Sequence, residues 1–216
     1  VDSEILKDPD PHYRVYDASI NAFNSAQPSY FHKMVGGYHA AKMQRYQDLI
    51  DRHLTQGNQR VFNMLNTKYF ILPGEGGQVR AQPNPGALGN AWFVDSIALV
   101  QNSNQEIDAL NTLDLQRAVA IHQEFNDYVA GLSPNSAGSI QLTEYRPNKL
   151  SYQTNSPQEG LAVFSEVWYG PDKGWQAYID DEPVTHIRAN YALRALKIPS
   201  GEHEIVFEFK PKSFYI

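Results

Sequence analysis

The chain has 216 residues, a formal net charge of −6 and no cysteine. This length allows one large domain or two small ones, each with a sizeable core. The acidic balance without a cationic stripe excludes nucleic-acid binding, and the lack of cysteine excludes disulfides, thiolate metal sites and cysteine nucleophiles.

The first part of the chain mixes strand and helix patterns. Arg14 to Tyr16 and Lys68 to Leu72 are short β-branched and aromatic runs, which predict strands. The pair Gly36–Gly37 predicts a turn before a helix that runs from Tyr38 to Leu54, and Gly57 suits the end of that helix.

Further elements follow before a polar break. Ala91 to Val100 predicts one strand, and Ala118 to Ile121 another. Between them, Ser103 with Glu106 has the spacing of a capping box that opens a short helix. The segment 133–138 is polar, contains Pro and Gly and lacks periodicity, so we place a domain boundary there.

The last third of the chain has the spacing of an all-β domain, because seven short apolar or alternating runs are separated by turn clusters. The clearest is His203 to Phe209, where Ile205, Phe207 and Phe209 face one way. The full set is Ile140 to Arg146, Lys149 to Thr154, Leu161 to Tyr169, Trp175 to Ile179, Val184 to Arg188, Tyr191 to Ile198 and His203 to Phe209. Leu161 to Tyr169 is apolar on both faces, which predicts a central strand.

The expected fold class is therefore α+β. A mixed α/β domain would span residues 1–138, and an antiparallel β-sandwich of jelly-roll or immunoglobulin-like type would span residues 139–216. Whether residues upstream of Val1 complete the sheet of the first domain is left open.

The strongest anion-site candidate is the Gly36–Gly37 turn before the expected helix, where backbone N–H groups could face a phosphate. Lys33, His39, Lys42 and Arg45 would add positive charge. The alternative is an ordinary turn, because the flanking glycines of a phosphate-binding loop are missing.

Two other kinds of site have weaker signals. The histidines lack ligand spacing, so we expect no metal site. Trp168, Trp175 and Tyr178 could stack on sugar rings, and the alternative is that they fill the sandwich core. No motif specifies a catalytic residue, and no cofactor is expected. A freestanding hydrolase would require a pocket with two close carboxylates.

Several stretches together resemble the YfhO-like bacterial membrane protein family, in the form found in Bacteroidetes. They cover nearly the whole chain and include Tyr13-Arg14-Val15-Tyr16-Asp17, Ser29-Tyr30-Phe31-His32-Lys33, Gly36-Gly37-Tyr38-His39-Ala40-Ala41-Lys42, Arg45-Tyr46-Gln47-Asp48-Leu49-Ile50, Asn63-Met64-Leu65-Asn66-Thr67-Lys68-Tyr69-Phe70-Ile71 and Gly174-Trp175-Gln176-Ala177-Tyr178-Ile179-Asp180. The Gly-Trp hairpin is less specific than the first blocks, because unrelated sandwich domains contain similar hairpins.

The resemblance implies a polytopic membrane protein related to glycosyltransferases that use polyprenyl-phosphate sugars. This chain would be its extracytoplasmic C-terminal region, on the periplasmic side of the cytoplasmic membrane. Its partners would be the membrane-embedded remainder of the protein and a glycan or polyprenyl-phosphate sugar. The family's catalytic acid lies in loops between early membrane helices, so the chain alone would be non-catalytic and would position substrate. The alternative is a non-catalytic carbohydrate-binding or protein-interaction module.

Overall fold

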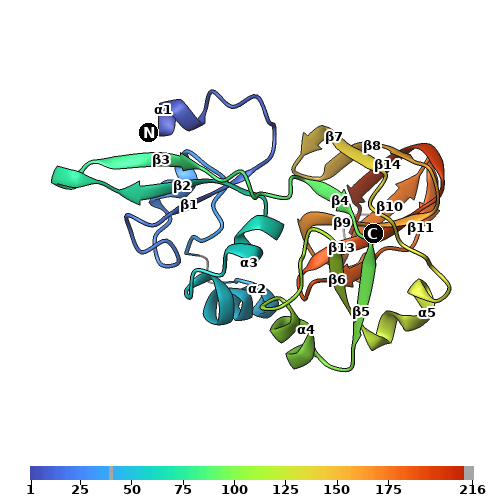
Figure 1. Cartoon of the computed structure of the whole chain (residues 1–216). Helices are drawn as coiled ribbons and strands as arrows, with labels where there is room; N and C mark the ends of the chain where they lie inside the picture. Colours follow the sequence, from blue (N-terminus) through green and yellow to red (C-terminus); the bar gives the residue numbers. More distant parts are fainter. Residues whose placement is uncertain (39–40, 212–216) are drawn as a thin grey trace. The chain divides into compact units, whose positions relative to one another are not determined.

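A computed structural model describes residues 1–38 and 41–211 (Figure 1). The chain forms two compact units, Val1–Gly89 and Asn90–Ile216. The first mixes helices with a small sheet, and the second is dominated by antiparallel strands. The expected α+β class with an antiparallel β-sandwich is thereby confirmed.

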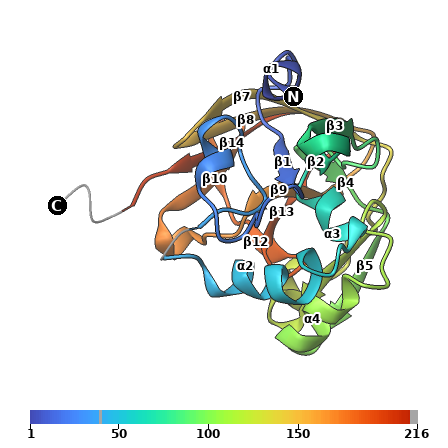
Figure 2. The same ribbon diagram turned by 90° about the vertical axis from the view of Figure 1, so that its left-hand side faces the viewer.

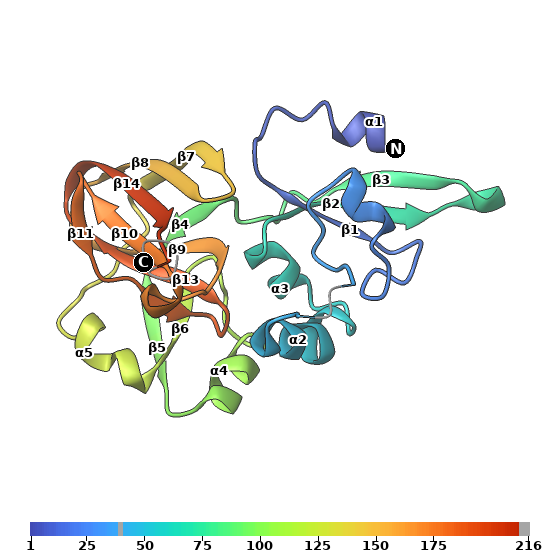
Figure 3. The same cartoon turned by 180° about the vertical axis from the view of Figure 1, so that it is seen from behind.

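The first unit is built on a three-stranded sheet in the order β1-β2-β3. β1 pairs with β2 in parallel, and β2 pairs with β3 antiparallel. Figures 2 and 3 show α1 on one side of this sheet and α3 and α2 on the other. The elements are α1 (Asp2–Ile5), β1 (Arg14–Asp17), η1 (Gln27–Tyr30), α2 (Gln44–Leu49), η2 (Ile50–Leu54), α3 (Gln59–Met64), β2 (Thr67–Pro73), η3 (Glu75–Gly77) and β3 (Val79–Pro83).

Apolar side chains pack against both faces of this sheet. Ile5 of α1 packs with Val15 of β1 and Ile71 of β2, and all three are almost fully buried. Toward α3, the ring of Phe62 lies 5.3 Å from that of Phe70 and 4.7 Å from that of Tyr16, measured between centroids. Tilted and edge-on ring packing of this kind stabilises a core beyond simple burial.

The predicted helix from Tyr38 to Leu54 is correct at its end and wrong at its start. α2 begins only at Gln44, and the π-helical segment η2 continues it to Leu54. Gly57 follows with φ +70°, a left-handed conformation that glycine adopts without a steric cost. The start is delayed because Gly37 N–H is bonded to Ala22 O at 2.6 Å, which holds the preceding chain in a loop against residue 22.

The second unit contains two antiparallel sheets, ordered β11-β10-β14-β8-β7 and β12-β13-β9-β4, and a parallel pair, β5-β6. β9 lies inside its sheet and is buried along most of its length, as expected for the run Leu161 to Tyr169. The elements are β4 (Ala91–Phe93), β5 (Ser96–Val100), α4 (Ser103–Ala109), β6 (Ala118–His122), η4 (Gln123–Phe125), α5 (Asn126–Val129), β7 (Ser139–Arg146), β8 (Lys149–Ser156), β9 (Gly160–Val167), η5 (Pro171–Lys173), β10 (Trp175–Ile179), β11 (Glu182–Val184), β12 (Ile187–Ala189), β13 (Leu193–Ile198) and β14 (Gly201–Phe209).

One hydrophobic core joins the two sheets of the sandwich. The ring of Phe164 on β9 lies 4.8 Å from Phe207 on β14 and 5.0 Å from Tyr152 on β8. Ile205 and Phe207 are fully buried, so the predicted alternation of the last strand is confirmed there. Contacts between rings from facing sheets are the expected way to close a sandwich.

The division into units does not coincide with the boundary expected after Gly138. β4 is hydrogen-bonded to β9, which ties the chain from residue 90 onward to the sandwich. Gly138 itself lies against β4, because a Cβ added to it would be 2.6 Å from Phe93 Cε2. The end of the polar segment before β7 is thus packed against a strand, whereas Ser133, Ser136 and Ala137 are exposed.

Candidate functional site

A small polar hollow of about 220 Å³ lies beside the N-terminal loop of the first unit. Two segments contribute its lining: the residues that follow α1, and the residues just before the chain bridges to β1 at Met34. The lining residues are Leu6, Asp8, Asp10, Pro11, Tyr13, Phe31, His32 and Lys33. The hollow therefore combines two carboxylates, a lysine, a histidine and two aromatic rings.

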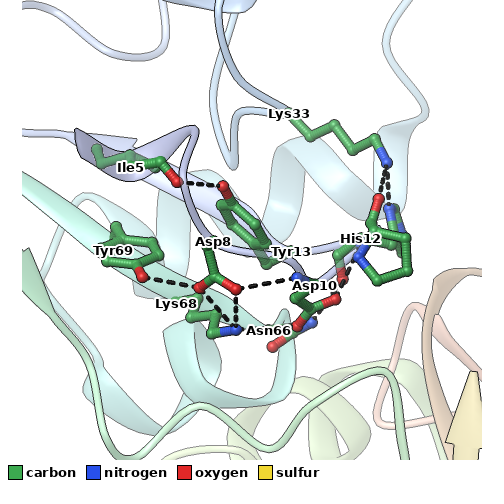
Figure 4. Close-up of polar contacts among 10 residues, drawn as sticks. Ile5, Asp8, Asp10, His12, Tyr13, Lys33, Asn66, Lys68 and Tyr69 are labelled. Atoms are coloured by element: carbon green, nitrogen blue, oxygen red, sulfur yellow. Dashed lines mark hydrogen bonds and ion pairs between the residues drawn. The ribbon is translucent and has the colours of Figure 1, made fainter. Parts of the chain in front are cut away.

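Lys68 of β2 organises the acidic side of this hollow, as Figure 4 shows. Its Nζ lies 2.8 Å and 3.0 Å from the two carboxylate oxygens of Asp8 and 3.2 Å from Asp10 Oδ2. Tyr69 donates its hydroxyl to Asp8 Oδ2 at 2.7 Å, and Asp10 N–H donates to Asp8 Oδ1 at 3.0 Å. Lys68 and two further donors thus fix the Asp8 carboxylate, and Lys68 also holds that of Asp10.

These contacts determine the charge state of the network. Burial opposes ionisation of Asp8, but the hydrogen bonds from Lys68, Asp10 N–H and Tyr69 outweigh it, so the pKa of Asp8 lies below its usual value. Burial likewise opposes the charge on Lys68, and the two carboxylates reverse this effect and raise its pKa. The hydrogen bond to Asp8 and partial burial raise the pKa of Tyr69. At neutral pH Asp8 is ionised and Lys68 is charged.

Lys33 forms the opposite side. Its Nζ donates to Pro11 O at 2.9 Å and lies 2.9 Å from His12 Nδ1 (Figure 4). The backbone of this loop is held in turn, because His12 N–H donates to Asp10 Oδ1 and Asn66 Nδ2 donates to His12 O. The loop 8–12 is therefore positioned by hydrogen bonds at both its carboxylates and its backbone.

This arrangement can accept and donate hydrogen bonds, and Asp8 differs from the acid of a glycosidase. A glycosidase needs a carboxylic acid with a raised pKa as its proton donor. The pKa of Asp8 is instead lowered, so this carboxyl group does not hold a proton at neutral pH. Residues 1–38 and 41–211 also contain no group of three or more metal-ligating side chains. Asp8 is therefore suited to accept hydrogen bonds rather than to donate a proton.

The structure separates the residues of the predicted anion site. Lys33 lines the polar hollow, whereas Lys42 lines a different hollow of about 330 Å³ together with Tyr38 and Asp51. Arg45 is half-buried in α2. His39, which the prediction also included, lies outside the described residues.

Gly36 and Gly37 have a packing role instead of the predicted place before a helix. A Cβ on Gly36 would lie 2.1 Å from Ala22 O, so only glycine fits there. Gly37 has φ +105° and donates its N–H to the same carbonyl oxygen. Because that N–H is bonded and α2 begins at Gln44, the pair does not form a helix N-terminus.

The expected sugar-stacking residues do not form a row. Trp175 and Tyr178 alternate to opposite sides of β10, and Trp175 packs on the core with the Arg194 guanidinium 4.2 Å from its ring centroid. The ring of Tyr178 lies 5.2 Å from Lys210 Nζ. Trp168 packs edge-on against the buried His186 at 4.9 Å. All three are half-buried.

The second unit also contains a buried ion pair. Glu106 of α4 is fully buried; its carboxylate accepts from Arg188 Nη2 at 3.4 Å and from Tyr191 N–H at 3.1 Å. The predicted capping box is therefore wrong by one residue. Asn102 is the N-cap and accepts from Gln105 N–H, while Glu106 reaches into the protein interior.

Sequence reasoning missed Asp8, Asp10 and Lys68. A local signal was present in the run Asp8-Pro9-Asp10-Pro11, because alternating prolines restrict the backbone and present two carboxylates from one loop. Lys68 gave no signal of its own, since it reads as an ordinary strand residue.

The fold defines a two-unit α+β protein with a β-sandwich in its second unit and a small polar hollow in its first. The family model described as bacterial membrane protein YfhO matches residues 100–216, more than half of the chain. The chain belongs to this family, as its sequence resemblance predicted, and membrane association follows. No curated protein and no solved structure matches it. Within the described part of the chain, no helix is long and apolar enough to cross a bilayer.

Proposed function

We propose that this chain is the extracytoplasmic part of a polytopic membrane protein resembling polyprenyl-phosphate-sugar-dependent glycosyltransferases. Its first unit would position the glycan or the lipid-linked sugar. The polar hollow is the observation that supports this most directly. Its volume of about 220 Å³ suits a single small polar group rather than a large apolar ligand.

The chemistry of the lining suits a sugar or its phosphate. The carboxylate oxygens of Asp8 and Asp10 can accept hydrogen bonds from hydroxyl groups. Tyr13 and Phe31 offer apolar ring faces to the C–H side of a pyranose, and Lys33 offers a charge to a phosphate oxygen. Because its pKa is lowered, the Asp8 carboxylate is poorly suited to donate a proton, so the site would hold substrate while other segments of the protein perform the transfer.

The test is sugar transfer from a polyprenyl-phosphate donor by the full-length protein in membranes. Lys33→Ala and Asp10→Asn should each lower transfer about tenfold or more, the effect of losing one charge-assisted hydrogen bond. Lys173→Ala is the matched control, since Lys173 is an exposed lysine of the other unit. Unchanged transfer in both site variants, at normal protein levels, would contradict the proposal.

Lys42→Ala distinguishes the polar hollow around Lys33 from the anion site that the sequence predicted at Gly36–Gly37. Lys42 lines a different hollow from Lys33, so its replacement should leave transfer near the level of the unaltered protein. Equal losses on replacing Lys33, Lys42 and Arg45 would instead favour a broad cationic surface along residues 33–45.

The alternative function, a sugar-binding module on the β-sandwich, has less support. It relied on an exposed row of Trp168, Trp175 and Tyr178. Trp175 is covered by Arg194 and points away from Tyr178, so the three rings offer no common platform.

A further inference from the structure

Exposed apolar side chains gather on the first unit near the polar hollow. Tyr30 is 85% exposed, Tyr38 65%, Leu6 56% and Phe31 55%. We call these four residues the aromatic rim. In the described part of the second unit, the exposed large apolar side chains are Leu99 and Tyr169, at 51% and 39%. Single exposed apolar residues are common on protein surfaces, but a cluster indicates a contact surface.

The rim residues are neighbours in space. Leu6 and Phe31 line the same hollow, and Tyr30 precedes Phe31 directly. Tyr38 lines the separate hollow that contains Lys42, and the residue before it is close to the start of this segment: a Cβ on Gly37 would be 3.5 Å from Ser29 Oγ. The part of the rim formed by Leu6, Tyr30 and Phe31 therefore borders the hollow that contains Lys33.

We infer that the aromatic rim lies in the headgroup region of the bilayer to which this membrane protein belongs. Tyrosine has an apolar ring and a polar hydroxyl, and such side chains concentrate where a membrane meets water. Phe31 and Leu6 supply apolar groups that can enter the acyl boundary, and the stem of Lys33 can lie along that surface with its ammonium toward phosphate.

Family membership selects a lipid surface over other occupants. The chain belongs to a family of bacterial membrane proteins, so a bilayer is its constant neighbour. The chain's net charge of −6 disfavours attraction to anionic lipid by charge alone. Insertion of the rim's aromatic rings into the bilayer surface is consistent with both the family membership and the negative charge. The inference rests on exposure and family, and it stands independently of the sugar proposed for the hollow.

The test uses the whole 216-residue chain and vesicles of phosphatidylethanolamine and phosphatidylglycerol. The unaltered chain should sediment with the vesicles, and raising the salt concentration should not release it, because ring insertion is not screened. The double replacement Tyr30→Ser with Phe31→Ser should lower the partition coefficient about tenfold or more. Both side chains are exposed, so circular dichroism should show an unchanged fold.

The matched control is Leu99→Ser with Tyr169→Ser, which removes exposed apolar groups of the second unit and should change partitioning less than about twofold. Failure of the unaltered chain to bind vesicles would overturn the inference and favour the protein's own membrane-embedded remainder as the occupant. Equal losses in the two double variants would also overturn it. So would self-association that the rim variant abolishes, because that result assigns the rim to a second copy.

Discussion

Replacing Lys68 with methionine removes the charge at the centre of the acidic network and keeps a side chain of similar length. The Lys68 side chain is 32% exposed and that of Asp8 only 9%. An exposed ion pair contributes about 0.2–1 kcal/mol, and removing one partner of a buried pair costs about 3–5 kcal/mol. For this half-buried pair we expect a loss of about 1–2 kcal/mol in the stability of the first unit at pH 7.

The loss should depend on pH in a direction set by the shifted pKa values. The pKa of folded Asp8 is lowered from its ordinary 3.8, so its contribution is present above pH 3.8 and disappears as the pH falls through the folded pKa. The pKa of Lys68 is raised from 10.5, so its contribution is present below pH 10.5 and disappears only as the pH rises through the folded pKa. The difference between the two proteins should therefore be largest near neutrality and shrink in acid.

The assay must report on the first unit alone. Trp92, Trp168 and Trp175, the only tryptophans, all belong to the second unit, so tryptophan fluorescence cannot follow the unfolding of the first. Hydrogen exchange of the β2 segment 67–73, read by mass spectrometry and corrected for the intrinsic exchange rate at each pH, does follow it. An equal difference in opening free energy at about pH 3 and pH 7 would refute the electrostatic reasoning and assign the effect of Lys68 to packing.

Two further predictions concern the second unit, and both can be read by urea unfolding followed through tryptophan fluorescence. Arg188→Met leaves the buried Glu106 carboxylate without its cation and should cost about 3 kcal/mol; Glu124→Gln is the control, since Glu124 is 47% exposed and its loss should cost less than about 1 kcal/mol. Similar losses in the two variants would contradict this. Burial, aided by Arg194, lowers the pKa of His186 to about 3, so the unfolded chain takes up a proton that the folded one rejects. The protein should lose stability as the pH falls below about 6.5, by up to roughly 1.4 kcal/mol per unit, and His186→Phe should remove that slope. Parallel slopes in both proteins would show that other groups cause the acid sensitivity.

Elements with a strong local pattern could be predicted from the sequence. β10 has the predicted bounds Trp175–Ile179, and the strand expected at His203 to Phe209 is β14, because alternation between core and solvent is itself a local property. The run Ala91 to Val100 is apolar apart from Asp95 and Ser96, and it forms two strands in different sheets. Asp95 marks the break, and its carboxylate accepts from Ser136 N–H and from Arg117. The polar pair Asp95-Ser96 was a local sign of the break, but the partners that hold Asp95 are distant in sequence and no local pattern indicates them.

The candidate site was predictable only in part, for the same reason. Lys33 was identified from charge near a Gly-Gly turn, but its actual neighbours come from the loop at Asp10 to His12. Lys68 reaches Asp8 across 60 positions of sequence. Gly36 was identified for the wrong reason. Glycine is needed at this position because the carbonyl oxygen of Ala22 approaches it closely, and not because a ligand binds there.

The bridge between Val15 and Met34 bears on how this site could diversify. Val15 accepts a hydrogen bond from Val35 N–H and donates its own N–H to Lys33 O, so the sheet itself holds the backbone of Lys33. The long crossover from β1 to β2, residues 18–66, is thereby divided into two loops that meet at a fixed point. The first of these loops supplies Phe31 and His32 to the hollow, so substitutions there can reshape the wall beside Lys33 without displacing its Cα. Related proteins could therefore differ in the ligand that fits this hollow while the strand that positions the lysine stays unchanged.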